Sequence, residues 1–479
     1  MNRVREEARE LDVIGEYDVI VVGGGPGGVP AALAAARAGS KTLIAERYGF
    51  FGGLATAGLM GPLFGYAEMK DPYVQYTKNP DTSGNGGPLI LGGIPLEIVR
   101  KLQDWGAAPR NENIQWEAIR FDPEMLKHLL DAMVTEAGVD ILFHTFVTGV
   151  IGTEDHIDYL VLESKSGRQA VKAGVFIDAT GDGDVAAYAG AEYTKGRKAD
   201  GTTQPMGTKV IIGGVEDVSE DERSKGYDLV NQAIDNHTLG IYHAFWKEVS
   251  EQGITLRKGE ITPTATRVAG DGTNVRDLTR AEIRARRDIL ETLRFYNERV
   301  PGYKKAYLIA TPAQIGVRET RQIVGLQMLT GNDVLAGRKN RDNAVARGCW
   351  WLDIHCPLGL ISSKSWICDK LCKVEPPCIM KRKYRDQLLD TTVPPKPIDY
   401  YDIPYGSLIP KTIDNLLMSG RCISADHFAM SSARVIGTCS AIGEAAGIAA
   451  ALAMSENVRP GDLDVELLRE KLKAVGVPL

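Results

Sequence analysis

One stretch, YDVIVVGGGPGGVPAALAAARAGSKTLIAE at residues 17–46, constrains the fold more than any other part of the chain. The short apolar run Asp18 to Val22 predicts a buried strand, and the Ala-rich segment Pro30 to Ala38 predicts a helix. Between them, GGGPGG places glycines at the three positions of a G-x-G-x-x-G turn. This order of strand, tight turn and helix is the one that binds a dinucleotide.

Each glycine of this turn has a physical role. Gly23 permits the sharp turn, Gly25 lets the backbone approach a pyrophosphate, and Gly28 lets the helix lie close to the strand. The N–H groups at the start of the helix then face the phosphates, whose negative charge the helix dipole favours. Together with Pro26 and Gly27, these glycines form the first part of a predicted nucleotide site.

The strand after the helix ends on an acidic residue. Thr42 to Ala45 is the predicted strand, and the carboxylate of Glu46 can accept hydrogen bonds from the ribose hydroxyls. A phosphate on the ribose would require a cation instead, so the nucleotide is predicted to be FAD or NAD rather than NADP. A lone glycine pattern is a weak signal in a chain with 52 glycines, but here the flanking elements stand in the right order.

Composition restricts the class of protein. The chain has 479 residues, of which 44% are hydrophobic and 25% charged, so two or three globular domains are expected. A net charge of −6 without a basic block argues against a nucleic-acid partner. Residues 1–16 are charged with mixed sign, unlike a signal peptide, and are expected to form a surface helix. We expect a cytoplasmic protein without a membrane span, because no long apolar stretch runs without glycine.

A second glycine-rich segment, RYGFFGGLATAG, directly follows Glu46. Small residues there would let the backbone pass close to a flat, bulky ligand, although a flexible loop would have the same composition. The candidate binding residues of this segment are Arg47, Gly52, Gly53, Leu54, Ala55 and Thr56.

This segment resembles the FAD-dependent oxidoreductases related to the flavoproteins of fumarate reductase and succinate dehydrogenase. It is more similar still to a broad bacterial FAD-dependent oxidoreductase family, which is also related to the flavoprotein subunit of heterodisulfide reductase. VFIDATGDGD at residues 175–184 and NLLMSGRCISADHFAMSSARVIGTCSAIGEAAGIAAALA at residues 415–453 carry the same resemblance. GVRETRQIVG at residues 316–325 matches less specifically.

The resemblance implies FAD as the cofactor, and because no covalent attachment site stands next to Gly52 and Gly53, the FAD is predicted to be noncovalent. The Gly-Gly segment would run beside the flavin, the ATG turn would close over the nucleotide part, and the Gly-Arg turn and final helix would complete the site. A helix N-terminus at the pyrimidine edge would stabilise negative charge as the ring takes a hydride, although a merely packed helix would have the same sequence. The residues so assigned are Val147, Ala179, Thr180, Gly181, Asp182, Gly420, Arg421, Gly437 and Thr438.

Three side chains are candidates for catalysis. His427 follows the Gly-Arg turn, and Arg434 stands just before the final helix, so the resemblance implies that both lie near the flavin. His355 lies in WWLDIHC, a segment where relatives place polar residues against the substrate. The histidines would transfer protons and Arg434 could bind a substrate carboxylate; hydrogen-bonded structural residues are the alternative.

Five of the seven cysteines lie between Cys349 and Cys378, and four of them could hold zinc or an iron–sulfur cluster. The spacing contains no CxxC pair and does not match the heterodisulfide reductase subunit, so scattered thiols are the alternative. The candidate metal ligands are Cys356, Cys368, Cys372 and Cys378.

The predicted fold is α/β. A doubly wound, Rossmann-like FAD-binding domain is expected from residues 1–195 and 401–479, with a mixed α+β substrate domain inserted at residues 196–400. The inserted part contains a charged surface helix at residues 278–300, and Arg318 and Arg321 are expected to form structural ion pairs around Glu319.

The predicted function is that of an FAD-dependent oxidoreductase, an enzyme that transfers a hydride between a small or medium organic substrate and flavin N5. The alternative is an electron-transfer flavoprotein subunit that passes electrons through a cysteine-ligated cluster to a redox partner protein. A nucleotide-binding regulatory protein without turnover is a third reading. The substrate and the electron acceptor do not follow from the sequence, and a homo-oligomer is left open.

Overall fold

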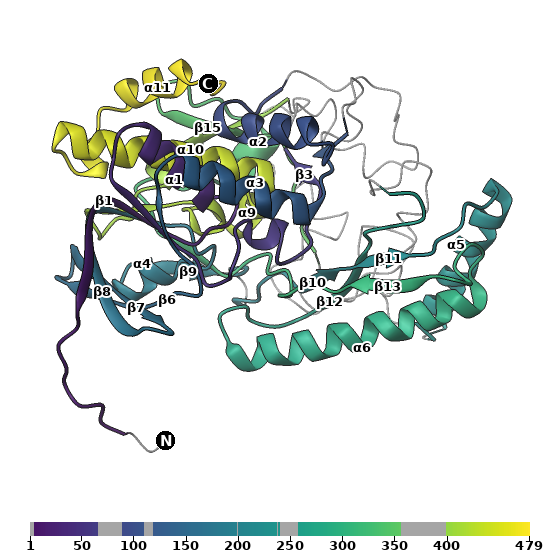
Figure 1. The fold of residues 1–479 in the computed structure, drawn as a ribbon. Coiled ribbons are helices and arrows are strands. Elements are labelled where there is room, and N and C mark those ends of the chain that lie inside the picture. Colours follow the sequence, from purple (N-terminus) through teal and green to yellow (C-terminus); the bar gives the residue numbers. More distant parts are fainter. Residues whose placement is uncertain are drawn as a thin grey trace.

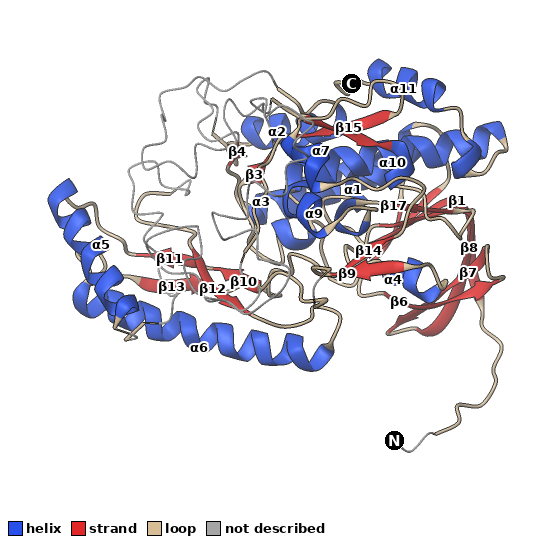
Figure 2. Cartoon of the chain, turned by 180° about the vertical axis from the view of Figure 1, so that it is seen from behind, coloured by secondary structure: helices blue, strands red, loops and turns tan. Residues whose placement is uncertain are grey.

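The computed structural model describes residues 4–65, 89–109, 118–198, 200–236, 238–239, 257–355 and 399–479. Two parts lie side by side in Figure 1. The larger part holds the central sheet and the C-terminal helices, and the smaller part consists of short strands lying along a long helix. Figure 2 shows the same division from behind.

The larger part is built on a seven-stranded sheet with the order β5-β2-β1-β8-β7-β6 and with β17 beside β8. Strands β1, β2, β5, β8 and β17 are parallel, whereas β6 and β7 run antiparallel beside β8. This order confirms the predicted Rossmann-like α/β fold. The strands are β1 (Val13–Val22), β2 (Thr42–Ala45), β5 (Asp140–Leu142), β6 (Phe146–Gly152), β7 (Ile157–Ser164), β8 (Gly167–Asp178) and β17 (Leu416–Met418).

Helix α10 (Ile436–Glu456) packs against α1 (Gly28–Arg37) with the two backbones in contact. A Cβ atom added at Gly443 would lie 2.1 Å from the carbonyl oxygen of Gly27, and one added at Gly447 would lie 2.2 Å from that of Ala31. Glycine is therefore required at both positions. The other helices of this part are α2 (Gly93–Asp104), α3 (Pro123–Glu136), α4 (Asp184–Tyr188), α7 (Gly331–Leu335), α9 (His427–Ala433) and α11 (Val465–Ala474).

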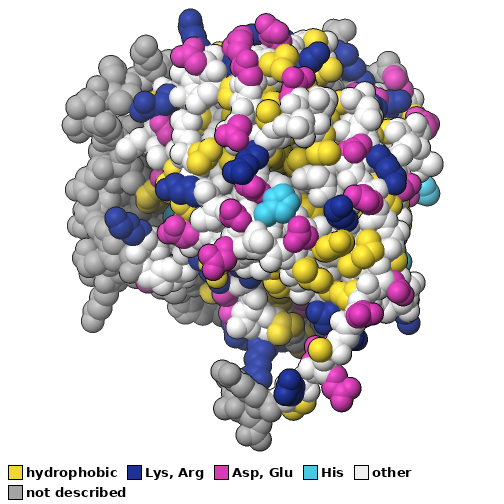
Figure 3. Space-filling view, turned by 90° about the vertical axis from the view of Figure 1, so that its left-hand side faces the viewer, with side chains coloured by type: hydrophobic (Ala, Val, Ile, Leu, Met, Phe, Trp, Pro, Cys, Tyr) yellow, Lys and Arg dark blue, Asp and Glu magenta, His cyan; other side chains and the backbone are white. Residues whose placement is uncertain are grey.

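Among the described residues, α10 is the one helix long and apolar enough to cross a membrane. Of its most apolar window, 89% is buried inside the protein, where it packs against α1, α2 and α11. Its apolar character is therefore that of a core helix. On the face shown in Figure 3, acidic and basic side chains are interspersed.

The smaller part has its own hydrophobic core, formed by residues between 210 and 306. Its strands pair antiparallel, β10 (Met206–Lys209) with β12 (Thr264–Val268) and β11 (Ile211–Gly213) with β13 (Tyr307–Ala310). The helices are α5 (Glu220–Asp235) and α6 (Val275–Arg299), and α6 confirms the predicted surface helix.

Short strand pairs complete the described chain: β3 (Leu63–Phe64) with β4 (Ala118–Ile119), β9 (Tyr193–Lys195) with β14 (Arg321–Ile323), and β15 (Ala344–Gly348) with β16 (Tyr401–Pro404). Apolar residues between 323 and 354 pack into the core of the larger part, together with both ends of the chain. The division at residues 195 and 400 stays a prediction.

One predicted element differs from the structure: residues 4–12 form no helix, and β1 begins at Val13, which pairs with Ala170 of β8. Strands β5 and β6 are separated at His144, which adopts a φ of 52°. Helix α10 begins at Ile436, so Gly437 lies in its first turn.

Candidate active site

The parallel strands end at one edge of the sheet, and the glycine motifs follow them there. The N–H of Ala179 donates to the carbonyl of Val22, and the N–H of Ser419 donates to that of Asp178, both at 2.9 Å. The turns after β1, β8 and β17 therefore lie together. In open α/β sheets, ligands bind at this carboxyl edge.

The first glycine turn is as tight as its sequence predicts. Gly23 has a φ of 99°, and a Cβ added at Gly28 would lie 1.7 Å from the Gly23 carbonyl oxygen. Helix α1 has Gly27 as its N-cap, without a side-chain cap and without an acidic residue in its first turn. The N–H groups of Gly28 and Val29 at its start both donate to the carbonyl of Gly25, at 3.0 and 3.1 Å, which closes the turn.

The two glycine-rich segments touch each other. The N–H of Gly52 donates to the carbonyl of Gly24 at 2.7 Å, and a Cβ added at Gly53 would lie 2.8 Å from the Cα of Gly25. Gly53 opens a single 3-10 turn, Gly53–Ala55, which includes Leu54. The segment after Glu46 therefore lies directly beside the first turn, as a site shared by both segments requires.

Glu46 is buried at the end of β2. Its carboxylate accepts hydrogen bonds from the N–H of Gly24 at 2.5 Å and from the N–H of Tyr48 at 2.9 Å. Burial raises the pKa of Glu46 above its ordinary value, against the lowering effect of these N–H donors and Arg47. The carboxylate is thus fixed beside the glycine turn, where a ribose would lie.

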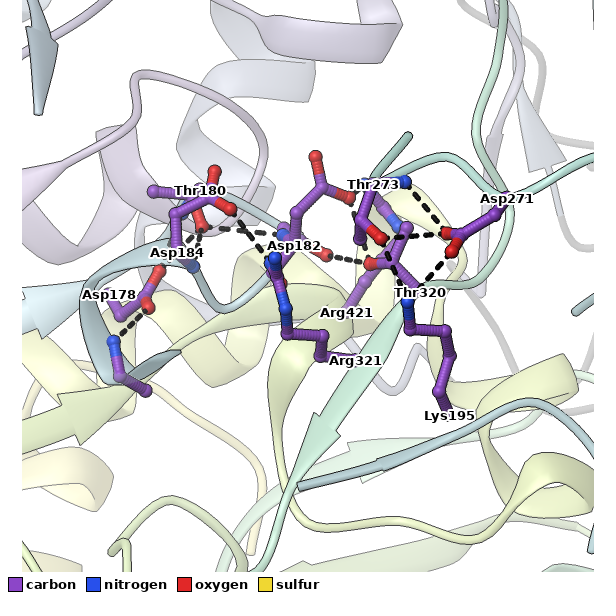
Figure 4. Close-up of polar contacts among 12 residues, drawn as sticks. Asp178, Thr180, Asp182, Asp184, Lys195, Asp271, Thr273, Thr320, Arg321 and Arg421 are labelled. Atoms are coloured by element: carbon purple, nitrogen blue, oxygen red, sulfur yellow. Dashed lines mark hydrogen bonds and ion pairs between the residues drawn. The ribbon is translucent and has the colours of Figure 1, made fainter. Parts of the chain in front are cut away.

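The ATG turn is held by a polar network, shown in Figure 4. The buried Asp178 accepts hydrogen bonds from the Thr180 hydroxyl at 2.7 Å and from the N–H of Ala186 at 3.0 Å. Burial raises the pKa of Asp178 to about 6. Asp182 accepts from Arg421 at 3.0 Å and from Thr320 at 2.9 Å, which ties the turn to the Gly-Arg turn.

Two buried polar atoms in this region have no hydrogen-bond partner among the described residues: Nη1 of Arg421 and Oγ1 of Thr438. A buried guanidinium N–H without a partner is costly unless a ligand satisfies it. Arg421 lies over Gly181, whose added Cβ would be 2.8 Å from Nη2. With the glycine turns and Glu46, these free groups fit the pyrophosphate and ribityl parts of FAD.

Several predicted binding residues have other partners. Arg47 is exposed and hydrogen-bonds to Gln314. The Thr56 hydroxyl donates to the carbonyl of Phe51 at 2.7 Å. Val147 is half-buried on β6. The assignment of these residues to FAD stays a prediction.

The three candidate catalytic side chains belong to one buried polar chain. Nδ1 of His427 lies 2.7 Å from Oε1 of Glu319, whose Oε2 accepts from the N–H of Gln204 at 2.9 Å. The Gln204 side-chain oxygen accepts from the N–H of His355 at 3.3 Å.

The same chain continues from His355 to the start of α10. Nε2 of His355 lies 3.2 Å from Oδ1 of Asp353, and Arg434 donates to Oδ2 of Asp353 at 2.8 Å. Arg434 directly precedes Val435, the N-cap of α10. Residues predicted one by one from three segments are therefore connected in the fold.

The charges of this chain are set by its burial and its arginines. Burial and the charge of Arg267 hold the pKa of His355 well below its ordinary value. Burial opposes ionisation of Asp353, but His355, Arg434 and Arg267 hold its pKa well below the usual range.

Sequence reasoning missed the residues that join the candidates: Gln204, Glu319 and Asp353. Asp353 stands two positions before His355, and an acidic residue so close to a histidine was the sequence signal that could have indicated their contact. No feature of the sequence indicated Gln204. The expectation of ion pairs around Glu319 is wrong for Arg321, which pairs instead with Asp184 at 2.8 Å. Nη1 of Arg318 donates a hydrogen bond to the carbonyl of Pro205 at 2.6 Å.

The predicted metal ligands Cys356, Cys368, Cys372 and Cys378 lie outside the described residues. Within the described part of the chain, no group of three or more His, Cys, Asp or Glu side chains could hold a metal ion. Cys439 in the first turn of α10 is buried, which raises its pKa to about 12, so it is a packed thiol.

A parallel sheet with a G-x-G-x-x-G turn, an acidic strand end and a closing C-terminal helix defines a Rossmann-type flavoprotein. The chain belongs to the FAD dependent oxidoreductase family, because the sequence model of that family matches residues 18–472. It is therefore an FAD-dependent oxidoreductase, an enzyme whose family uses FAD.

Similarity to individual proteins is more limited. The chain is 31% identical to the thiamine thiazole synthase of Methanococcus vannielii over 169 residues, which are 35% of this chain and 52% of that protein. It is 34% identical to the mitochondrial dihydrolipoyl dehydrogenase of Schizosaccharomyces pombe over 90 residues, 19% of this chain and 17% of that protein. The chain thus spans about half or less of these curated relatives.

Among solved structures, a geranylgeranyl bacteriochlorophyll reductase-like protein from Thermoplasma acidophilum is 16% identical, with a TM-score of 0.41. The match covers 96% of this chain and 83% of that one. The myxobacterial chondrochloren halogenase is 12% identical, with the same TM-score, and covers 96% and 78%.

Proposed function

We propose that the enzyme transfers a hydride between a small or medium organic substrate and FAD, with His427 as the residue that takes or gives the accompanying proton. When bound, FAD supplies the redox chemistry, because its flavin ring accepts or donates the hydride. The observation that carries the proposal is the buried pair of Glu319 with His427, which lies on the segment between the Gly-Arg turn and α10.

Glu319 determines which nitrogen of His427 is free. Its carboxylate is buried and accepts from Nδ1 of His427 at 2.7 Å. Nε2 is then the nitrogen that can exchange a proton with a substrate. A carboxylate that orients a histidine in this way is a recurring device of proton-transferring enzymes.

The start of α10 is suited to negative charge. Its N-cap, Val435, offers no side-chain hydrogen bond, and no acidic residue stands in the first turn. The helix dipole and the free N–H groups would favour an anionic group in this position. Gly65 lies against this turn, because a Cβ added there would be 3.3 Å from Oγ1 of Thr438.

Other parts of the proposal go with this function. We propose FAD binding by the predicted glycines, Glu46, the ATG turn, Arg421 and the start of α10, and a cytoplasmic location. The alternative of a cluster that serves a redox partner protein depends on cysteines outside the described residues, and no described contact favours it.

The proposal is tested by anaerobic reduction of the FAD-loaded enzyme. A panel of alcohols, amines and carboxylic acids is mixed with the protein, and the loss of oxidised flavin absorbance is followed. We expect at least one donor to reduce the flavin, and His427→Asn to slow this reduction by about 10²- to 10⁴-fold while FAD content is unchanged.

A matched control is available in the same part of the protein. Nδ1 of His156 also lies 2.7 Å from a carboxylate, that of Asp414, but the His156 side chain is 44% exposed. The flavin of the His156→Asn variant should be reduced at the wild-type rate. Equal rates for wild type and His427→Asn would refute the role of His427, and a flavin that no donor reduces would favour the regulatory alternative.

A further inference from the structure

Glu319 brings Gln204 and His427 together. One oxygen of its carboxylate lies 2.7 Å from Nδ1 of His427, and the other accepts a hydrogen bond from the backbone N–H of Gln204 at 2.9 Å. All three residues are buried. Gln204 is therefore a close neighbour of the histidine to which the proposed function gives the proton transfer.

The side-chain amide of Gln204 has a fixed orientation. Its oxygen, Oε1, accepts from the backbone N–H of His355 at 3.3 Å. Since that N–H can only donate, the atom facing it must be the amide oxygen rather than the amide nitrogen. The backbone is held as well, because the carbonyl of the next residue, Pro205, accepts from Nη1 of Arg318 at 2.6 Å. The direction of the side-chain N–H groups is thus set before any ligand binds.

The amide nitrogen of Gln204 is a donor without an acceptor. Gln204 is 1% exposed, and its Nε2 has no hydrogen-bond partner among the described residues. The same holds for two other buried atoms of this polar chain, Nδ1 of His355 and Nε of Arg434. A buried polar group without a partner is costly. Three such atoms in the chain that contains His427 indicate a position where a ligand supplies the missing partners.

The chemistry of the free amide group restricts the reacting part of this ligand. An amide N–H group can only donate, so it requires an acceptor. The oxygen of an alcohol accepts, and so does the carbonyl oxygen formed from that alcohol. An ammonium group carries only donors, and a carbon–carbon bond offers no acceptor. Beside His427, Gln204 therefore favours a substrate whose reacting carbon carries an oxygen atom.

We propose that Gln204 binds the oxygen on the reacting carbon, and that the substrate pair is an alcohol and the corresponding aldehyde or ketone. In the oxidation, the C–H bond breaks and its electron pair goes with the hydrogen to the flavin as hydride. The O–H proton goes to Nε2 of His427, and the C=O bond forms. The N–H of Gln204 donates to the same oxygen throughout and stabilises the negative charge that grows there as the proton leaves. This inference rests on the proposed function, because it names the substrate class of the same site.

The test compares ketones with amines of the same carbon skeleton: acetone with 2-propylamine, cyclohexanone with cyclohexylamine, and acetophenone with 1-phenylethylamine. Binding to the oxidised, FAD-loaded protein is measured without oxygen at pH 7, where the amines are charged, as a saturable change in the flavin absorbance spectrum. A ketone cannot reduce the flavin, so its binding is measured without turnover. We expect at least one ketone to bind at least tenfold more tightly than its amine.

Two variants of Gln204 identify the group that discriminates. Gln204→Met has a similar length and no amide, so that ketone should bind at least tenfold more weakly while the affinity for the amine stays that of the wild type. A merely structural role of Gln204 would weaken both. Gln204→Glu keeps an oxygen for the N–H of His355 and replaces the free N–H2 by a second oxygen. The preference should then shift at least tenfold toward the amine.

Gln327→Glu is the matched control. The side-chain oxygen of Gln327 also accepts a hydrogen bond, from Nδ2 of Asn343 at 2.9 Å, but Gln327 lies outside the polar chain. The affinities of this variant for the ketone and the amine should be those of the wild type. Far-UV circular dichroism and the unfolding midpoint show whether each variant is folded.

Equal or tighter binding of the amine in every pair, no binding of any ketone, or an unchanged preference in a folded Gln204→Met or Gln204→Glu variant would each overturn the inference. If neither variant folds, the comparison of probes on the wild-type protein decides. Failure of the proposed function is a different result, in which no donor reduces the flavin, whereas ketone binding is measured without reduction. A flavin that is reduced only by donors without an oxygen on the reacting carbon overturns this inference and leaves the proposed function standing.

Discussion

Replacing Gly25 by alanine should leave the FAD-free protein folded and weaken its binding of FAD at least tenfold. The atom nearest to a Cβ added at Gly25 is the Cα of Gly53 at 3.7 Å, an ordinary van der Waals contact, so the methyl group fits the protein itself. In a dinucleotide site, however, this glycine is where the backbone approaches the pyrophosphate. A tenfold loss corresponds to about 1.4 kcal/mol of binding free energy. Equilibrium titration of FAD fluorescence measures it.

The neighbouring glycine provides a sharp contrast. In Gly28→Ala the methyl group would lie 1.7 Å from the Gly23 carbonyl oxygen, so the turn itself must move. We expect this variant to lose both FAD affinity and stability, by about 1–3 kcal/mol or more of unfolding free energy.

Gly461→Ala is the control for both variants, because its added Cβ would make an ordinary contact at 3.6 Å far along the chain from the turn. Its FAD affinity and its free energy of unfolding should be those of the wild type. A folded Gly25→Ala protein that binds FAD with wild-type affinity would contradict the assignment of the pyrophosphate to this turn.

Replacing Glu444 by glutamine should stabilise the protein at pH 8 by about 1–3 kcal/mol and have little effect near pH 4.5. Glu444 lies on α10, and its carboxylate accepts from the N–H of Ile94 at the start of α2, at 3.0 and 3.1 Å. Burial raises the pKa of Glu444 to about 7. Glutamine keeps an acceptor for this N–H and carries no charge.

The direction of the pH dependence follows from linkage. Between the ordinary carboxyl pKa of 4.5 and about 7, the folded protein keeps the Glu444 proton that the unfolded chain releases. The free energy of unfolding therefore falls as pH rises through this window, and the loss is complete above pH 7. Its full size is roughly 3 kcal/mol, from 1.36 kcal/mol for each pKa unit.

Chemical denaturation at several pH values measures this effect as the difference between wild type and Glu444→Gln. The buried Asp178, with a pKa of about 6, adds a similar slope to both proteins, so it cancels in the difference. Glu136→Gln, at an exposed end of α3, should show no such trend. A difference that is constant with pH, or that grows toward low pH, would contradict the account.

Local elements could be predicted from the sequence because short-range chemistry specifies them. Thr42–Ala45 is the observed second strand, and Asp122 caps α3 through the N–H groups of Glu124 and Met125, with Pro123 first in the helix. The family resemblance placed the C-terminal segment in the same domain as the glycine turn, and β17 does pair with β8.

The remaining features depend on contacts between distant segments. The conformation of residues 4–12 depends on the pairing of β1 with β8, because this pairing begins directly after them at Val13. The pair of His427 and Glu319 joins residues 108 positions apart, and local sequence gives no sign of such a distance. The close packing of α10 on α1 likewise depends on where Gly443 meets Gly27, which only the assembled fold determines.

The central claim, that this chain is an FAD-binding oxidoreductase, is tested most directly by the visible spectrum of protein purified without oxygen, with iron and zinc determined on the same sample. The account predicts a resolved two-band flavin spectrum, either as purified or after FAD is added, which bleaches on reduction. A protein that shows no flavin spectrum even after incubation with FAD would contradict it.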